Sequence, residues 1–174
     1  MWQTFFTAAM LIVLSGTSSS GKTSLAIAMQ ELSNRPLLHL EADRFAPVLR
    51  PDHPANGDPQ FRRRATVAMH EAIATFGRGG LDIIVDASLP TEPELRDVCL
   101  AILRGVPDTR VVAVRCSVAM LRQREAGRDD RPAGWAEEQA QIVYEGVNFD
   151  ETTDTTNGSS HEHANTLLQR LFPA

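Results

Sequence analysis

The stretch that decides the fold is Leu11–Ser24, which reads LIVLSGTSSSGKTS. It opens with four branched apolar residues, a length and composition typical of a buried parallel strand. The pattern G-x-x-x-x-G-K-T follows from Gly16 to Thr23, and a helix-like run, Leu25–Leu32, comes next. A strand before and a helix after are the context that a phosphate-binding loop requires. We therefore predict such a loop here, rather than a chance turn rich in glycine and serine.

The residue types in this loop match the chemistry of phosphate binding. Gly16 and Gly21 permit a sharp turn that aims backbone N–H groups at one anion. The helix that starts there adds the positive end of its dipole. Lys22 would bridge the β- and γ-phosphates of ATP, and the Thr23 hydroxyl would ligate Mg²⁺. The predicted nucleotide-binding residues are Gly16, Thr17, Ser18, Ser19, Ser20, Gly21, Lys22, Thr23 and Ser24.

Size and charge narrow the class of protein. The chain has 174 residues, which suits a single domain, and we interpret residues 1–9 as an extension before a domain of residues 10–174. A net charge of −5 without a basic block argues against a nucleic-acid partner. No segment approaches the roughly 20 apolar residues of a membrane span. Cys99 and Cys116 form no metal or disulfide pattern and suit the cytoplasm, while a homo-oligomer stays open.

Strands and helices alternate along the chain. After Leu11–Ser15, apolar runs predict strands at 37–40, 81–85 and 110–115, with a more polar last strand at 147–156. Helical patterns lie at 22–33, 61–76, 92–103, 118–126, 135–145 and 161–171. The alternation predicts an α/β fold of three layers, with a mostly parallel five-stranded sheet and helices on both faces.

Two connecting segments carry more specific expectations. Phe45–Gln60 is rich in proline and glycine, and we expect a long loop that covers a substrate. Thr91 and Glu94 have the spacing of a capping box at the start of the helix at 92–103.

Acidic residues follow two of the predicted strands. Asp43 comes after the second strand and Asp86 after the third. In open α/β sheets the ligand lies outside the carboxyl ends of the strands, so we expect both aspartates at the ligand crevice. Asp86 resembles a Walker B carboxylate that holds Mg²⁺ directly or through water. For each residue, the alternative is an aspartate that only completes a turn.

The segment Arg124–Gly134 is charged and lies between two predicted helices. In a nucleotide kinase it would be a lid whose arginines neutralise charge on the transferred group and exclude water. A surface loop with solvated ion pairs explains the same spacing equally well.

Taken together, these motifs resemble the chloramphenicol phosphotransferase-like proteins, which are small P-loop kinases. The resemblance implies the P-loop kinase fold, with a lid at about 124–134. The matching pieces run in family order between Leu11 and Pro173: Gly16–Thr23, the Asp43 segment, Ile83–Asp86, Val114–Cys116, Arg124–Gly134, Val143–Asp150 and Asp154–Thr156.

The resemblance also implies an activity. It is transfer of the γ-phosphate of ATP to a hydroxyl of a small molecule, which in the family type is the primary hydroxyl of chloramphenicol, and this inactivates the antibiotic. Asp43 matches the family's general base, while Lys22, Arg128 and Arg131 match its phosphate-handling cations.

The chain departs from the family pattern in places. The family often has two aspartates where this chain has Asp86 and Ala87, and Phe45–Gln60 matches it only loosely. Because that region would shape the acceptor pocket, the reaction class carries over better than the acceptor. We expect Phe45 and Phe61 to supply an apolar wall there.

Other functions share the same phosphate-handling residues. A kinase for another alcohol, such as a nucleoside, a sugar or a shikimate-like compound, is the first alternative. A nucleotide-binding switch that hydrolyses ATP slowly and a family member that has lost activity are the others. Asp43 at the end of a strand favours transfer to a small molecule.

Overall fold

The computed structural model describes residues 9–45, 50, 52–127 and 134–173, without the side chains of Asp43, Phe45 and Gln141. Its centre is one five-stranded sheet in which all neighbours are parallel. The strands, in the order β2-β3-β1-β4-β5, are β1 (Leu11–Ser15), β2 (Leu38–Glu41), β3 (Ile83–Asp86), β4 (Thr109–Arg115) and β5 (Glu151–Asp154). The predicted fold class is confirmed.

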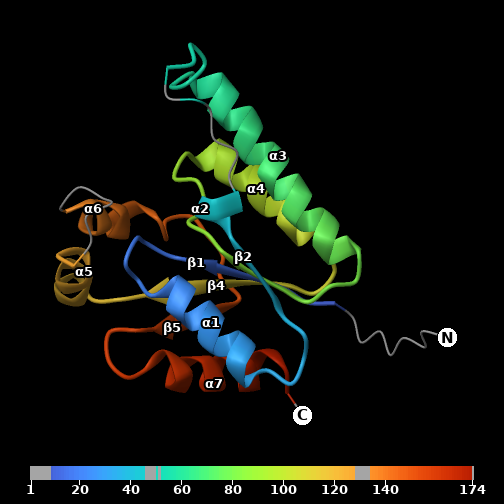
Figure 1. The fold of residues 1–174 in the computed structure, drawn as a ribbon, viewed down its shortest axis with the longest axis vertical. Coiled ribbons are helices and arrows are strands. Elements are labelled where there is room, and N and C mark those ends of the chain that lie inside the picture. The colour runs from blue at the N-terminus through green and yellow to red at the C-terminus, as the bar shows by residue number, and fades with distance from the viewer. Residues whose placement is uncertain (1–8, 46–49, 51, 128–133, 174) are drawn as a thin grey trace.

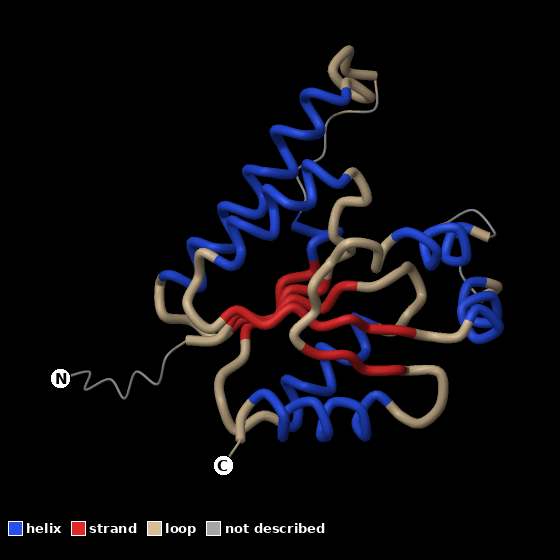
Figure 2. Tube along the Cα trace, turned by 180° about the vertical axis from the view of Figure 1, so that it is seen from behind, coloured by secondary structure: helices blue, strands red, loops and turns tan. Residues whose placement is uncertain are grey.

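Helices cover both faces of this sheet, as Figures 1 and 2 show. One layer holds α1 (Lys22–Leu32) and α7 (Ser160–Leu171), and the other holds α3 (Pro59–Arg78) and α4 (Pro93–Arg104). The shorter helices α5 (Val118–Glu125) and α6 (Trp135–Ile142) pack against each other beside the sheet. A single helical turn, α2 (Ala42–Phe45), follows β2 directly.

The central strand β1 explains why the sequence opens with an unbroken apolar run. Ile12 and Leu14 pack in the core beneath α1 and α7. Leu11 and Val13 point the other way, into the core beneath α3 and α4. A strand buried on both faces has no solvent side, so its sequence does not alternate.

The order of the strands decides where a ligand can bind. The connection after β1 runs to one side of the sheet, to β2, and the later connections run back towards β5. The carboxyl end of β1 is therefore a topological switch point, where open α/β sheets form a crevice.

Some local expectations need correction. The last strand covers only Glu151–Asp154, and residues 147–150 and 155–156 of the predicted strand lie outside it. The capping box at Thr91 and Glu94 is wrong: α4 begins at Pro93, and its N-cap residue, Glu92, makes no side-chain cap hydrogen bond. Proline fits the first helical position because the N–H it lacks would have no partner within the helix.

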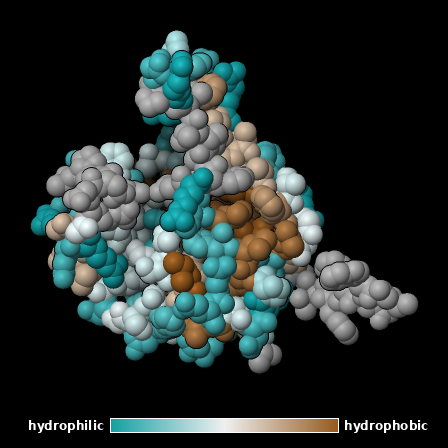
Figure 3. Space-filling model, in the orientation of Figure 1, coloured by the Kyte–Doolittle hydropathy of each residue, from teal (hydrophilic) through white to brown (hydrophobic). Residues whose placement is uncertain are grey.

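An apolar patch lies on the surface near the edge of the sheet. Figure 3 shows apolar side chains gathered on one face beside α3 and β2, and Leu38 in the edge strand is 43% exposed. Among the described residues, no helix is both long and apolar enough to cross a membrane.

Candidate active site

The phosphate-binding loop occupies the turn between β1 and α1. Gly21 precedes α1 with a φ of 90°, a conformation that residues other than glycine rarely adopt. A Cβ atom on Gly16 would collide with the carbonyl oxygen of Val114 in the neighbouring strand. The strand, the turn and the helix that the motif requires are all present, and at both glycine positions the geometry disfavours a residue with a side chain.

Lys22 folds back over this loop. Its Nζ donates hydrogen bonds to the carbonyl oxygens of Gly16 and Thr17, both at 2.9 Å. The ammonium group therefore lies at the start of the loop, where it can meet a phosphate that the loop's backbone binds.

Thr23 and Asp86 meet beside the lysine. Asp86 ends β3 with only 8% exposure, and the Thr23 hydroxyl lies near enough to its carboxylate to help lower the pKa of Asp86. His39 of β2 adds a third polar group, with Nε2 3.6 Å from Oδ2 of Asp86. Burial alone would raise the pKa of Asp86. The contacts with His39 and Thr23 and the charge of Lys22 outweigh it, so the pKa is lowered and the carboxylate is ionised at neutral pH.

This pair of side chains fits a magnesium ion. A hydroxyl and an ionised carboxylate are the oxygen ligands that Mg²⁺ prefers, and Mg²⁺ usually shares its sites with substrate phosphates. Within the described ranges, no group of three His, Cys, Asp or Glu side chains could hold a metal by itself. The donor set therefore suits a nucleotide-bound metal rather than a free metal centre.

A cavity of about 1240 Å³ extends from the loop across the carboxyl edge of the sheet. Besides the loop and α1, its walls come from the ends of β2 and β3, from α5 and α6, and from the segment after β5. The lining residues outside the loop and α1 are Glu41, Arg44, Asp86, Ala87, Ser88, Arg124, Trp135, Gln139, Thr155, Gly158, Ser160 and His163.

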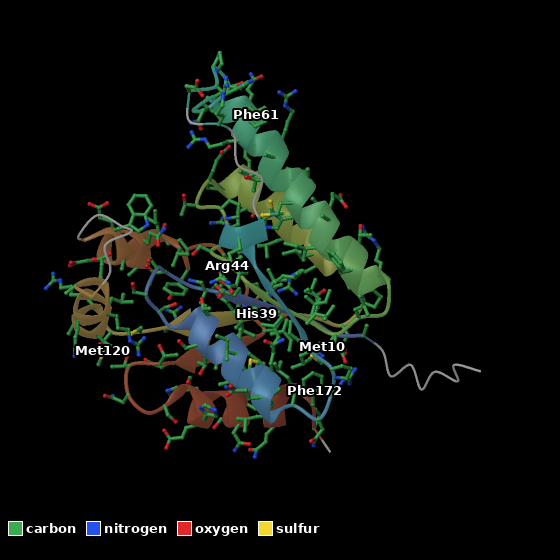
Figure 4. All side chains as sticks on the ribbon, viewed as in Figure 1. Met10, His39, Arg44, Phe61, Met120 and Phe172 are labelled. Atoms are coloured by element: carbon green, nitrogen blue, oxygen red, sulfur yellow. The ribbon has the colours of Figure 1, made fainter. Side chains whose placement is uncertain are left out.

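Asp43 lies in α2, between two residues that line this cavity. Glu41 precedes it and Arg44 follows it (Figure 4), but its own side chain is outside the described part of the structure. Arg128 and Arg131 also lie outside the described residues. The backbone of Asp43 thus lies beside the cavity, where the sequence predicted it. The catalytic roles of Asp43, Arg128 and Arg131 stay predictions.

Phe61 does not form the expected wall. It lies at the outer end of α3, as Figure 4 shows, and is not among the residues that line the cavity. The reason is the length of α3, whose first turn projects beyond the sheet. The structure does not describe the side chain of Phe45, so the expectation that Phe45 lines the acceptor pocket stays a prediction.

The sequence had placed Arg124 only at the edge of a lid, but the structure places it on the phosphate-binding loop. Its Nη1 donates to the carbonyl oxygen of Ser19 at 3.3 Å, and its Nη2 donates to the carbonyl oxygen of Thr155 at 2.7 Å. The Thr155 hydroxyl donates to the carbonyl oxygen of Ser20 at 2.6 Å. Thr155 directly follows β5 in the structure, but the predicted strand ran to residue 156, so the signal that marked Asp43 and Asp86 did not mark Thr155.

The two ends of the predicted lid are joined by Glu125. This buried carboxylate accepts hydrogen bonds from the backbone N–H groups of Gly134 and Ala136, at 2.8 and 2.9 Å. The Thr17 hydroxyl in turn donates to the carbonyl oxygen of Ala136 at 2.7 Å. The start of α6 is therefore fixed both to α5 and to the phosphate-binding loop.

Comparison with known proteins identifies the family. The model of the family described as "Chloramphenicol phosphotransferase-like protein" matches residues 9–172. "Putative O-phosphotransferase Rv2636" of Mycobacterium tuberculosis strain H37Rv is 31% identical over 183 residues, which cover 90% of this chain and 80% of that protein.

Solved structures share the fold at lower identity. Shikimate kinase from Acinetobacter baumannii, in complex with shikimate, is 18% identical, with a TM-score of 0.68 over 95% of this chain and 94% of that one. The Mycobacterium tuberculosis APS kinase CysC, in complex with AMPPNP and APS, is 17% identical, with a TM-score of 0.64 over 96% and 99%. The fold is that of P-loop kinases. The chain belongs to the chloramphenicol phosphotransferase-like family and is a phosphotransferase of the kinase type.

Proposed function

We propose that this enzyme transfers the γ-phosphate of ATP, bound with Mg²⁺, to a hydroxyl group of a small molecule. One observation carries the proposal: a single cavity joins the phosphate-binding loop and the Thr23–Asp86 pair to the carboxyl end of β2, where Asp43 lies. Donor and acceptor could thus meet in one space that has a carboxylate at its edge.

The nucleotide half of the cavity has distinct places for the parts of ATP. The backbone of Gly16–Ser24 and the Lys22 ammonium would bind the phosphates. Thr23 and Asp86 would hold Mg²⁺, which when bound neutralises charge on the β- and γ-phosphate oxygens. Arg124 and Thr155 line the wall beyond the loop and would face the ribose and the base. The AMPPNP in the APS kinase structure supports a nucleotide in this fold.

The acceptor half would supply the proton transfer. Asp43 would accept the proton of the acceptor hydroxyl, or orient that hydroxyl for in-line attack on the γ-phosphorus. The P–O bond to ADP then breaks, and ADP carries the leaving charge. Lys22, Arg128 and Arg131 would stabilise the charge on the phosphoryl group during transfer.

The charges near β2 favour an acceptor that is not acidic. Glu41 and Arg44 line the cavity beside Asp43 and form an ion pair, with Nε 3.0 Å from Oε2. The guanidinium is already matched by one carboxylate, and the sequence has a further acidic residue, Asp43, in the same turn. A carboxylate-bearing acceptor such as shikimate would meet repulsion here, whereas a neutral alcohol such as chloramphenicol would not. We therefore propose chloramphenicol, or another neutral alcohol such as a nucleoside or a sugar, as the acceptor.

The reaction with chloramphenicol would inactivate an antibiotic. Because the reaction consumes ATP, we propose the cytoplasm as its compartment. The direct test incubates the purified chain with Mg·ATP and, separately, chloramphenicol, a nucleoside, a hexose and shikimate. Mass spectrometry of each acceptor measures the gain of one phosphoryl group. The Lys22→Ala variant, which lacks the ammonium that meets the phosphates, is the matched control.

Each outcome of this test has a meaning. Phosphorylated chloramphenicol supports the proposal in full, and another neutral phosphorylated alcohol supports the reaction with a different acceptor. Phosphorylation of shikimate alone contradicts the charge argument. ADP release that no acceptor accelerates, without any phosphorylated product, contradicts transfer and favours an ATP-hydrolysing switch.

A further inference from the structure

Gln139 of α6 reaches the phosphate-binding loop from the side opposite α1. Its Oε1 accepts a hydrogen bond from the backbone N–H of Ser18 at 2.8 Å. The same oxygen lies 3.3 Å from the hydroxyl oxygen of Thr17, which donates its proton to Ala136 instead. The side chain lines the cavity, so it belongs both to the loop and to the space above it.

The bond to Ser18 fixes the orientation of the glutamine amide. Only the oxygen of an amide can accept from an N–H group, so Nε2 must lie on the side away from Ser18. In the part of the chain that the structure describes, Nε2 has no hydrogen-bond partner. Two N–H donors on a held side chain are therefore left for a group in the cavity.

Lys22 shows which part of a nucleotide that group would be. The carbonyl of the Thr17–Ser18 peptide accepts from Nζ of Lys22, and the N–H of the same peptide donates to Gln139. The carbonyl and the N–H of this trans peptide point in opposite directions, so the lysine and the glutamine hold it from two sides. Both side chains line the same cavity, and a phosphate that meets the lysine there would share that space with the glutamine amide.

We propose that Nε2 of Gln139 donates a hydrogen bond to the terminal phosphoryl group of bound ATP and keeps this bond during transfer. The inference rests on the proposed function, which places ATP in this loop. A donor that is already held by Ser18 needs no reordering when charge develops on the phosphoryl oxygens. Hydrogen bonds to charged groups are the stronger kind, so one such donor is worth about tenfold or more in affinity or rate.

The test compares a ligand that has the terminal phosphate with one that lacks it. The dissociation constants of Mg·AMPPNP and Mg·ADP are measured by calorimetry for the wild type and Q139E. Glutamate keeps an oxygen for the Ser18 N–H, but it replaces the donor with a charged oxygen. In Q139E we expect the affinity for AMPPNP to fall about tenfold or more, and the affinity for ADP to change less than about threefold. We expect kcat to fall together with the affinity for AMPPNP.

Two further variants make the result specific. E138Q changes the next, exposed residue of α6, which does not line the cavity, and it should leave both affinities unchanged. Q139M has neither the donor nor the acceptor, and should lower the affinity for AMPPNP more than that for ADP. It also serves if Q139E does not fold, which thermal unfolding reports.

Equal losses for the two ligands, or no loss, in Q139E and Q139M would overturn the inference and leave Gln139 as a support of the loop. That result leaves the proposed function standing, because the wild type still binds both nucleotides. A wild type that binds neither ligand overturns the proposed function and this inference together.

Discussion

Arg124 donates from Nη2 to the backbone carbonyl of Thr155 at 2.7 Å, and this bond joins the end of α5 to the segment after β5. The other end of the guanidinium, Nη1, donates to the carbonyl of Ser19 in the phosphate-binding loop. One side chain thus connects three segments that are far apart in the sequence and meet at the cavity. Its planar fork suits this task because the donors have fixed relative directions.

Replacing Arg124 by lysine should therefore weaken nucleotide binding. A single ammonium cannot satisfy Ser19 and Thr155 together, so the wall of the cavity loosens. We expect the dissociation constant of ADP to rise about tenfold, measured by calorimetry. Arg110→Lys is the control, since Arg110 forms a surface ion pair with Asp108. An ADP affinity in R124K equal to that in R110K would show that Arg124 plays no part in nucleotide binding.

Asp43→Asn tests the proposed base. Amide and carboxylate have nearly the same shape, but the amide cannot take a proton, so kcat should fall about 10²–10⁴-fold. The dissociation constant of Mg·ATP should stay within about threefold, because the phosphates bind at the loop. Steady-state kinetics and calorimetry measure the two effects. Asp52→Asn, at an exposed aspartate paired with Arg50, is the control, and unchanged turnover in D43N would remove Asp43 from the role.

Asp86 should make stability depend on acid. The pKa of its carboxyl is below the usual 3.8 in the folded chain, since the contacts with His39 and Thr23 and the charge of Lys22 outweigh burial. A group with a lowered folded pKa stabilises the fold above its unfolded pKa, and this contribution is lost as the pH falls through the folded value.

Urea unfolding at several pH values checks this contribution. The free energy of unfolding of the wild type should decline between about pH 5 and about pH 3 more steeply than that of Asp86→Asn. The asparagine variant has no carboxyl to protonate at this position, so its slope reports all the other groups. Parallel curves for the two proteins would mean that the pKa of Asp86 is not lowered.

Glu125→Gln should destabilise the attachment of α6. The buried carboxylate accepts from two backbone N–H groups, those of Gly134 and Ala136, and glutamine offers only one accepting oxygen. One buried N–H would face an amide donor, which costs about 1–3 kcal/mol in the free energy of unfolding. Urea unfolding measures the loss. Glu138→Gln, at an exposed position of the same helix, should change stability by less than about 0.5 kcal/mol.

Local patterns in the sequence were sufficient for the framework of this protein. The apolar run Leu11–Leu14 predicted a strand buried on both faces, and the glycines and lysine after it predicted a phosphate-binding turn. These signals are local, because a strand, a turn and a helix start follow one another within 14 residues. The position of Asp86 after a strand was also enough to bring it to the crevice beside Thr23, because parallel strands end at one edge.

Two expectations drawn from positions along the chain were wrong. Thr91 and Glu94 had the spacing of a capping box, but Pro93 between them sets the start of α4. Phe61 looked close to the acceptor pocket along the chain, but the long helix α3 carries it away from the cavity. In both cases a spacing was correct and the geometry around it differed.

The sequence by itself determined that this chain folds as a parallel α/β domain around a phosphate-binding loop, because periodicity and turn chemistry act between near neighbours. Only the tertiary structure decided that Arg124, Thr155 and Gln139 complete the walls of that loop. Their side chains form hydrogen bonds with the backbone of Ser18, Ser19 and Ser20, and each of these bonds spans more than 100 residues of sequence. Such bonds depend on how α5, α6 and β5 pack around β1, and no local pattern records that packing.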